Sequence, residues 1–332
     1  MSAWDAHALT DDSGMRKGSR MRFLILGAGG LGGYYGGMLL KGGADVAFLV
    51  RPRRAAQLAA RGLVVKNPDG DFVSPAKTLL AGEVDGPYDI VLMTCKAYDL
   101  DSAIEAIVPA VGPQSAVLPV LNGIDHITIL TDRFGDHRVL GGMSLVRAEL
   151  SAEGDIRRPE GSGVGKTSYG ELNGERSARC EAIQAAFAAG GVASTLSDDI
   201  LAEMWAKFCG FAAAATIAAL IRARAGEIAS TGAGAAFVDS VFKECARVTA
   251  AEGYPTPPEM GDLIREMFAR PGSTYGPSIL WDLENGRRTE GEQTVGDMVR
   301  RADRHGLEVP LLRAALCNLQ IHEARTRAAT LA

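Results

Sequence analysis

The stretch RFLILGAGGLG, residues 22–32, decides the fold of this 332-residue chain. Its first five residues have the apolar, branched side chains of a buried strand, and a G-x-G-x-x-G pattern follows without a gap. A helical segment, YYGGMLLKGG, and a second apolar stretch, DVAFLV, come next. A strand, a glycine-rich turn, a helix and a second strand form the β-α-β unit of dinucleotide-binding domains. We therefore predict a Rossmann-type domain here.

The glycines of this motif have separate physical tasks in such a unit. Gly27 permits the tight turn, Gly29 lets the backbone reach a pyrophosphate, and Gly32 lets the helix pack closely on the strand. Gly30 and Leu31 lie within the same motif, which leads into a helix whose N-terminal N–H groups attract phosphate. We predict that all five residues contact a dinucleotide. The alternative is a glycine-rich turn in an ordinary strand-to-helix connection.

The end of the second strand favours NADPH over NADH. An NAD site normally has Asp or Glu there to hold the ribose 2′-hydroxyl, whereas this chain reads FLVRPRR over residues 48–54. Arg51 can form a bidentate contact with a 2′-phosphate, and Arg53 and Arg54 add positive charge. The alternative is a solvated arginine cluster at the start of a helix.

The rhythm of the sequence changes near residue 195. Before it, short apolar stretches alternate with helical or loop segments, which predicts parallel β-α-β units. The predicted strands are RFLILG, ADVAFLV, DIVLMTC, SAVLPVLN and VLGGMSLV. After it, helical spacing dominates, including one long helical stretch over residues 278–306. We predict a disordered extension over 1–20, an α/β Rossmann-type domain with a mostly parallel sheet over 21–195, and an all-helical C-terminal domain over 196–332.

Composition limits the classes of partner. The net charge of -5 and the lack of a Lys/Arg-rich run argue against nucleic acid and anionic membranes. The longest uncharged helical run, residues 208–221, is short for a membrane span and predicts a buried core helix. The five cysteines are odd in number and form no C-x-x-C pair, which predicts a reduced, cytoplasmic protein. The scattered histidines indicate no metal site.

Two polar residues follow predicted strands. Lys96 comes after DIVLM and Asn122 after AVLPVL. A doubly wound sheet presents groups to its ligand at the carboxyl ends of its strands, so both residues are candidates for the ligand site. The alternatives are a surface lysine that caps a helix and an ordinary turn asparagine.

Lys207 is the last charged residue before the uncharged run, one helical turn after Glu203. Reduction of a ketone requires a hydride donor at the carbon, and a proton or cation at the oxygen, where negative charge develops. A partly buried lysine supplies the proton and the charge. The alternative is a surface i, i+4 pair with Glu203, which contributes a few tenths of a kcal/mol.

The motifs GAGGLGG, FLVR, TCKAY, LNG, EMWAKF, TEGE and HGLEVP occur in this order across residues 21–325. This series resembles the ketopantoate reductase family. The resemblance implies a Rossmann domain followed by a helical domain, and NADPH-dependent reduction of 2-dehydropantoate (ketopantoate) to (R)-pantoate, a step of pantothenate biosynthesis toward coenzyme A. It implies a small 2-oxo acid as partner, and a homodimer is one candidate assembly.

The resemblance also assigns roles to individual residues. It implies that NADPH, or the space at its nicotinamide end, is contacted by Gly27, Gly29, Gly32, Arg51, Lys96 and Asn122, the last two of which also border the substrate. It implies that Lys207 is the catalytic lysine, that Glu290 is the active-site glutamate that assists it, and that Ser278 contacts the substrate.

The chain departs from the family pattern in the substrate pocket. Phe211, Ala215 and Val295 stand where better-known members carry asparagines, so the polar wall has become apolar. A D-2-hydroxyacid dehydrogenase acting on branched or aromatic 2-oxo acids is therefore the first alternative. A non-catalytic NADPH-binding sensor is the second alternative, although a sensor needs neither Lys207 nor Glu290.

Overall fold

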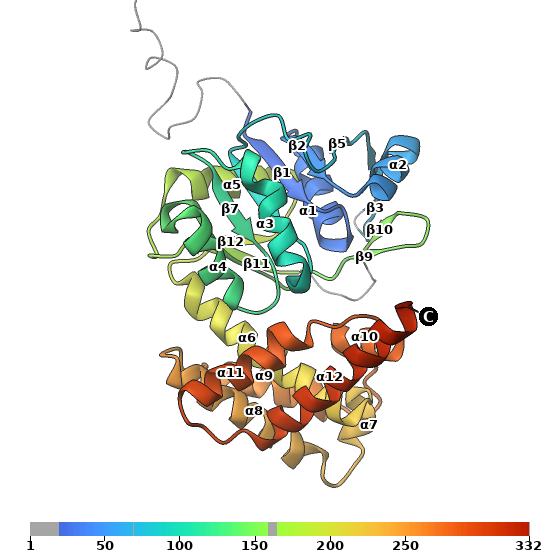
Figure 1. Ribbon diagram of the computed structural model, residues 1–332, viewed down its shortest axis with the longest axis vertical. Helices are drawn as coiled ribbons and strands as arrows, with labels where there is room; N and C mark the ends of the chain where they lie inside the picture. The colour runs from blue at the N-terminus through green and yellow to red at the C-terminus, as the bar shows by residue number, and fades with distance from the viewer. Residues whose placement is uncertain (1–19, 69, 159–164, 332) are drawn as a thin grey trace, which may run out of the picture. The chain divides into compact units, whose positions relative to one another are not determined.

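The structure is a computed structural model that describes residues 20–68, 70–158 and 165–331. The predicted extension lies outside the described residues, except for Arg20. The chain divides into two compact units, which Figure 1 colours from blue to green and from yellow to red. The first unit holds the chain up to Leu121 together with His126–Leu201, and the second holds Asn122–Asp125 together with Ala202–Ala332. The short segment Asn122–Asp125 thus belongs to the helical unit, which the sequence did not suggest.

The first unit is built on a five-stranded sheet with the order β5-β2-β1-β6-β7. Its strands are β1 (Arg22–Leu26), β2 (Asp45–Leu49), β5 (Lys77–Leu79), β6 (Ile90–Met93) and β7 (Ala116–Pro119). Every neighbouring pair is parallel. Both faces of β1 are covered, because Phe23, Leu24 and Ile25 are all buried. This sheet confirms the predicted Rossmann-type fold.

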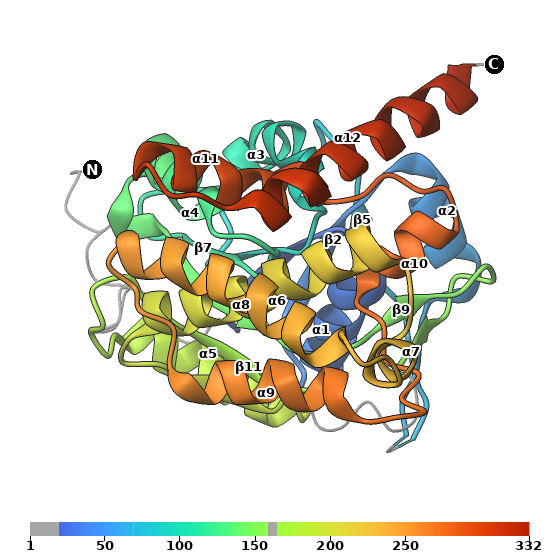
Figure 2. The same cartoon turned by 90° about the horizontal axis from the view of Figure 1, so that it is seen from below.

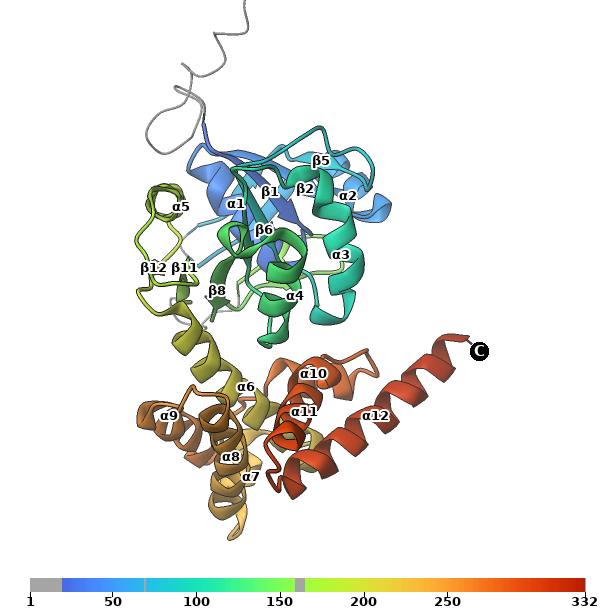
Figure 3. The ribbon, with the colours of Figure 1, turned by 60° about the vertical axis from the view of Figure 1, so that its left-hand side comes forward.

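Helices cover both faces of this sheet. The helices of the first unit are α1 (Gly30–Lys41), α2 (Pro52–Arg61), α3 (Leu100–Ile107), α4 (Asp125–Phe134) and α5 (Ala178–Gly190), with short 3-10 turns η1 (Ala97–Asp99), η2 (Val108–Ala110) and η3 (Asp136–Arg138). Figure 3 shows α1 and α3 on opposite faces. Tyr35 of α1 is fully buried in a core with Phe48 and Phe187, so α1 is the central helix of this unit.

Two smaller sheets complete the first unit. One has the order β4-β3-β10-β9 and contains β3 (Leu63–Lys66), β4 (Phe72–Ser74), β9 (Glu149–Leu150) and β10 (Ile156–Arg157). The other has the order β12-β11-β8 and contains β8 (Leu140–Ser144), β11 (Thr167–Glu171) and β12 (Ser194–Leu196). VLGGMSLV continues the parallel series only at its first residue, where Val139 forms a parallel bridge with Val117 of β7, whereas the strand β8 itself pairs antiparallel with β11. The apolar pattern of a strand does not specify its partner.

The regular elements of the second unit are all helices in its described residues, as Figure 2 shows. Its helices are α6 (Ile200–Ile221), whose first two residues lie in the first unit, α7 (Ala225–Ala229), α8 (Gly234–Ala251), α9 (Pro258–Ala269), α10 (Ser278–Glu284), α11 (Asp297–Arg304) and α12 (Pro310–Leu331), with a π-helical turn η4 (Glu292–Gly296). The predicted all-helical C-terminal domain is confirmed.

The long helical stretch expected over residues 278–306 is broken, however. Helix α10 ends at Glu284, and Gly286 has a φ of +61°, a conformation that favours glycine and stops a helix. The chain turns helical again at residue 291 and passes through η4. A π-helical turn often marks a functional site. Glu290 lies two residues before this turn.

Helix α6 contains the uncharged run of the sequence. Among the described residues it is the one helix with the length and hydropathy of a membrane span, with a mean hydropathy of 1.6. In the structure, 72% of that apolar window is buried inside the protein. Phe208, Ala212 and Ile217 have almost no exposed surface, as in the core helix of a globular domain.

Candidate active site

The glycine-rich loop connects β1 to α1, and its glycines have different steric surroundings. Gly27 has a φ of +93°, which disfavours any other residue. A Cβ atom on Gly32 would clash with the Gly27 carbonyl oxygen, and one on Gly30 would clash with the Ala148 carbonyl oxygen. A Cβ atom on Gly29 would meet nothing within 4 Å. The space that the motif predicts for a pyrophosphate is therefore open at Gly29.

The N-terminus of α1 suits an anion. Gly29 is its N-cap and offers no side-chain hydrogen bond, and the first turn contains no acidic residue. Leu31, the second helical residue, is partly buried. The positive end of the helix dipole is thus not neutralised by the first turn of the helix, and a dinucleotide pyrophosphate fits these residues.

Arg51 lies in an exposed position just after the end of β2. It is the N-cap of α2, and its side chain is 81% exposed. Its Nη2 atom lies 3.0 Å from the Oδ2 atom of Asp99. Asp99 ends the η1 turn after β6, and nothing in the local sequence pattern pointed to it. A carboxylate from another loop thus pairs with the arginine that follows β2.

Arg54 has a different task from the one predicted. Instead of adding to an exposed positive field, its Nε atom donates to the Ala28 carbonyl oxygen and its Nη1 atom to the Gly154 carbonyl oxygen, both at 2.9 Å. Burial lowers the pKa of Arg54. Arg54 therefore ties the glycine-rich loop to the turn between β9 and β10. Arg53 is exposed, as expected.

Lys96 is the N-cap of η1 and is exposed. It lies at the carboxyl end of β6, in the first unit, as the strand pattern predicted. The same short turn contains Asp99, whose backbone N–H donates to the Lys96 carbonyl oxygen at 2.9 Å. The turn thus links the position of Lys96 to that of the Arg51 partner.

The second unit brings together three of the predicted residues. The Nζ atom of Lys207 donates to Oδ1 of Asn122 at 3.4 Å, and Nδ2 of Asn122 donates to Oε2 of Glu290 at 3.3 Å. Lys207 comes from the second turn of α6, Asn122 from the segment after β7, and Glu290 from a position two residues before η4. We call Lys207, Asn122 and Glu290 the lysine triad.

Backbone geometry supports the asparagine of this triad. Gly123 has a φ of +88°, and a Cβ atom there would lie 2.9 Å from the Gln293 carbonyl oxygen. Only glycine combines this conformation with so close an approach to the η4 turn. The Asn-Gly pair therefore lets Asn122 lie beside Glu290.

The surroundings of Lys207 change its acidity. Burial lowers the pKa of Lys207 to about 8, and the negative charge of Glu290 opposes this shift. Glu290 itself is 5% exposed. Loss of water disfavours the charged ammonium, while a nearby carboxylate favours it. Lys207 is consequently a group that can release a proton near neutral pH, which a surface lysine does not do.

The predicted substrate residues lie at different depths. Phe211, one turn after Lys207 on α6, is partly buried, whereas Ala215 and Val295 are buried almost completely. Ser278 is exposed at the start of α10, and its side chain forms no hydrogen bond with the lysine triad in the described part of the chain. Substrate contact by these four residues stays a prediction.

Two stretches of the chain match protein-family models. Residues 23–174 match the model described as ketopantoate reductase PanE/ApbA, and residues 199–323 match the model of its C-terminal region. The uncharacterized oxidoreductase YkpB of Bacillus subtilis strain 168 is 35% identical over 304 residues, which cover 92% of this chain and 99% of that protein.

Solved structures of other proteins also have a fold similar to that of this chain. The crystal structure of 2-dehydropantoate 2-reductase from Geobacter metallireducens is 28% identical and has a TM-score of 0.81, covering 90% of this chain and 99% of the other. D-mandelate dehydrogenase, solved with NADH and anilino(oxo)acetate, shares the fold at 22% identity, with a TM-score of 0.83 and coverage of 92% and 100%.

A Rossmann-type unit with an open glycine-rich loop and a helical unit with a buried lysine together define a two-domain oxidoreductase. The chain belongs to the ketopantoate reductase family.

Proposed function

We propose that this protein uses NADPH to reduce the keto group of a 2-oxo acid, either 2-dehydropantoate or a close relative. The observation that supports this proposal most strongly is the lysine triad, in which a desolvated ammonium is held by an amide oxygen 3.4 Å away. A residue with this acidity suits proton donation to a carbonyl oxygen. A protein that only bound NADPH would gain nothing from burying such a lysine.

The residues of the triad divide the chemical work. Bound NADPH supplies the hydride for the keto carbon. The ammonium of Lys207 stabilises the negative charge that develops on the keto oxygen and transfers a proton to it. Glu290 favours the charged form of Lys207, and Asn122 orients its nitrogen. Neutral Lys207 then recovers a proton from water, so each turnover consumes one proton.

The preference for NADPH rests on Arg51. Its guanidinium is exposed at the end of β2 and can form two parallel hydrogen bonds with a 2′-phosphate. Asp99 at 3.0 Å holds the guanidinium in place but also competes for it. The selectivity of the site is therefore a balance between the phosphate and this carboxylate.

A second candidate is reduction of branched or aromatic 2-oxo acids to D-2-hydroxy acids. Phe211 lies on the Lys207 face of α6 and offers an apolar contact where a hydroxylated substrate needs a hydrogen-bond partner. The same fold occurs in D-mandelate dehydrogenase.

A substrate panel tests the proposal. Oxidation of NADPH is followed with 2-dehydropantoate, 2-oxoisovalerate, 2-oxoisocaproate and phenylpyruvate, with the Lys207→Ala variant as the matched control. We expect at least one of these acids to be reduced far faster by the unmodified protein than by the control. If none is, the proposed function is wrong.

A further inference from the structure

Arg301 on α11 contacts its own helix and three other segments of the second unit with one guanidinium. Its Nε atom lies 3.0 Å from Oδ2 of Asp297, its Nη1 atom 2.6 Å from Oε2 of Glu252, and its Nη2 atom 3.1 Å from Oδ1 of Asp125. The guanidinium carbon also lies 4.8 Å from the ring centre of Trp205. All three nitrogens of this 9% exposed side chain are used.

Three of these contacts lie on the segments that carry the lysine triad. Trp205 precedes Lys207 by two residues on α6, and Asp125 ends the segment that begins with Asn122. Asp297 begins α11 directly after the η4 turn, which follows Glu290.

We infer that Arg301 is the positioning residue of the lysine triad, with Asp125 as the contact through which it holds Asn122. The inference rests on the proposed function, because it assigns the triad a catalytic task. Arg301 is not assigned any contact with substrate or cofactor. Its role is to fix the distances among the three side chains of the lysine triad.

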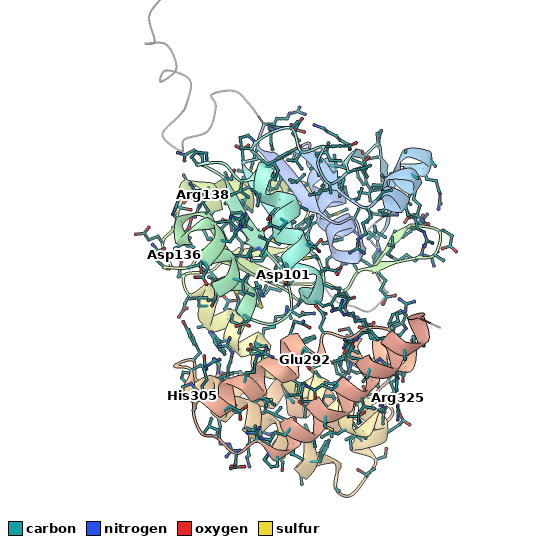
Figure 4. All side chains as sticks on the ribbon, in the orientation of Figure 1. Asp101, Asp136, Arg138, Glu292, His305 and Arg325 are labelled. Carbon is teal, nitrogen blue, oxygen red and sulfur yellow. The ribbon has the colours of Figure 1, made fainter. Side chains whose placement is uncertain are left out.

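The energetic basis is the burial of the charges. Asp297 is 1% exposed, and burial raises its pKa, so its carboxylate depends on Arg301 for compensation. Glu252 also accepts from His305, at the end of α11 and labelled in Figure 4, and from Arg304. A buried charge that loses its partner is strongly destabilising, so the cluster tolerates only one arrangement. Such a cluster is a rigid support.

Asp125 offers the clean test, because its side chain is 51% exposed and its removal leaves the buried pairs in place. The variant is Asp125→Asn, and the matched control is Asp303→Asn. Asp303 lies on α11, as Arg301 does, its side chain is 54% exposed, and it forms an ion pair with Arg313. We measure kcat and KM for reduction of a 2-oxo acid. We also measure hydrogen exchange of the amides at 122–125, and the pH-dependent acylation of Lys207 by acetic anhydride.

We expect Asp125→Asn to lower kcat by about tenfold to a hundredfold, as a displacement of about 1 Å does, with the KM for NADPH unchanged. The amides at 122–125 should exchange faster, and Asp303→Asn should behave like the unmodified protein. Equal kcat in the two variants, or unchanged exchange at 122–125, would overturn the inference. If the unmodified protein reduces no 2-oxo acid, the proposed function fails. Exchange and Lys207 acylation then still test whether Asp125 positions the triad. If the exchange at 122–125 or the pH dependence of Lys207 acylation is the same in Asp125→Asn as in the unmodified protein, the inference is overturned.

Discussion

The side-chain nitrogen of Lys207 donates a hydrogen bond to Oδ1 of Asn122 at 3.4 Å, although the two residues are 85 positions apart in the sequence. The amide nitrogen of Asn122 donates in turn to Glu290. An amide with an acceptor on one side and a donor on the other has only one suitable orientation. Asn122 therefore holds the ammonium and the carboxylate at a defined separation, as the proposed role of Lys207 as proton donor requires.

Removal of the lysine amine should abolish most of the turnover without preventing cofactor binding. Lys207→Ala is expected to lower kcat by about 10²–10⁴, the usual contribution of a positioned acid. NADPH affinity, measured by titration of cofactor fluorescence, should change little, because Arg51 and the glycine-rich loop lie in the other unit. Turnover at the normal rate would show that Lys207 is not the acid.

Cofactor preference should depend on the exposed guanidinium at the end of β2. NADPH should be favoured over NADH by about tenfold to a hundredfold, since a charge-assisted bidentate contact contributes roughly 1.5–3 kcal/mol and Asp99 offsets part of it. Arg51→Ala should raise the KM for NADPH and leave that for NADH nearly unchanged. Asp99→Asn is the companion variant, and it should increase the preference. Equal use of both cofactors by the unmodified protein would refute this assignment.

Substrate choice should be broad and should favour apolar acids. A site that hydrogen-bonds a substrate hydroxyl can reject analogues without it by about 10⁴, but Phe211 offers no such bond, and each buried methylene favours binding by roughly 0.8 kcal/mol. We expect 3,3-dimethyl-2-oxobutyrate, which lacks the 4-hydroxyl of ketopantoate, to have a kcat/KM within about tenfold of ketopantoate. Phe211→Asn should shift the ratio toward ketopantoate. A preference of about a thousandfold for ketopantoate in the unmodified protein would mean that another group binds the hydroxyl.

Local features of the fold could be predicted from the sequence because their causes are local. The glycine-rich loop lies where the motif placed it, since Gly27 and Gly32 are required by backbone geometry within ten residues of β1. The sequence singles out Lys207 because it is the last charged residue of α6 before the uncharged run. Its pKa and its contact with Asn122 depend on a segment from between β7 and α4, so the position of that segment could not be read from spacing.

Features that depend on distant partners escaped prediction. Asp99 pairs with Arg51 across 48 residues, and Arg54 binds the carbonyl of Gly154 across 100 residues. An arginine in a run of arginines gives no sign of whether its guanidinium meets solvent or backbone. Arg301 gave no signal either, because Arg300 and Arg301 are adjacent and only the fold buries one of them.

The most direct test of the account is the pH dependence of kcat for reduction of the best 2-oxo acid. The pKa of Lys207 is lowered by burial from the ordinary value of about 10.4 to about 8, so the proton-donating ammonium is present below that pH and is lost above it. The rate should be level on the acid side and fall about tenfold per pH unit above about 8, and Lys207→Ala should lack this limb. A rate that stays level up to about pH 10, or the same limb near 8 in Lys207→Ala, would contradict the assignment of Lys207 as the proton donor.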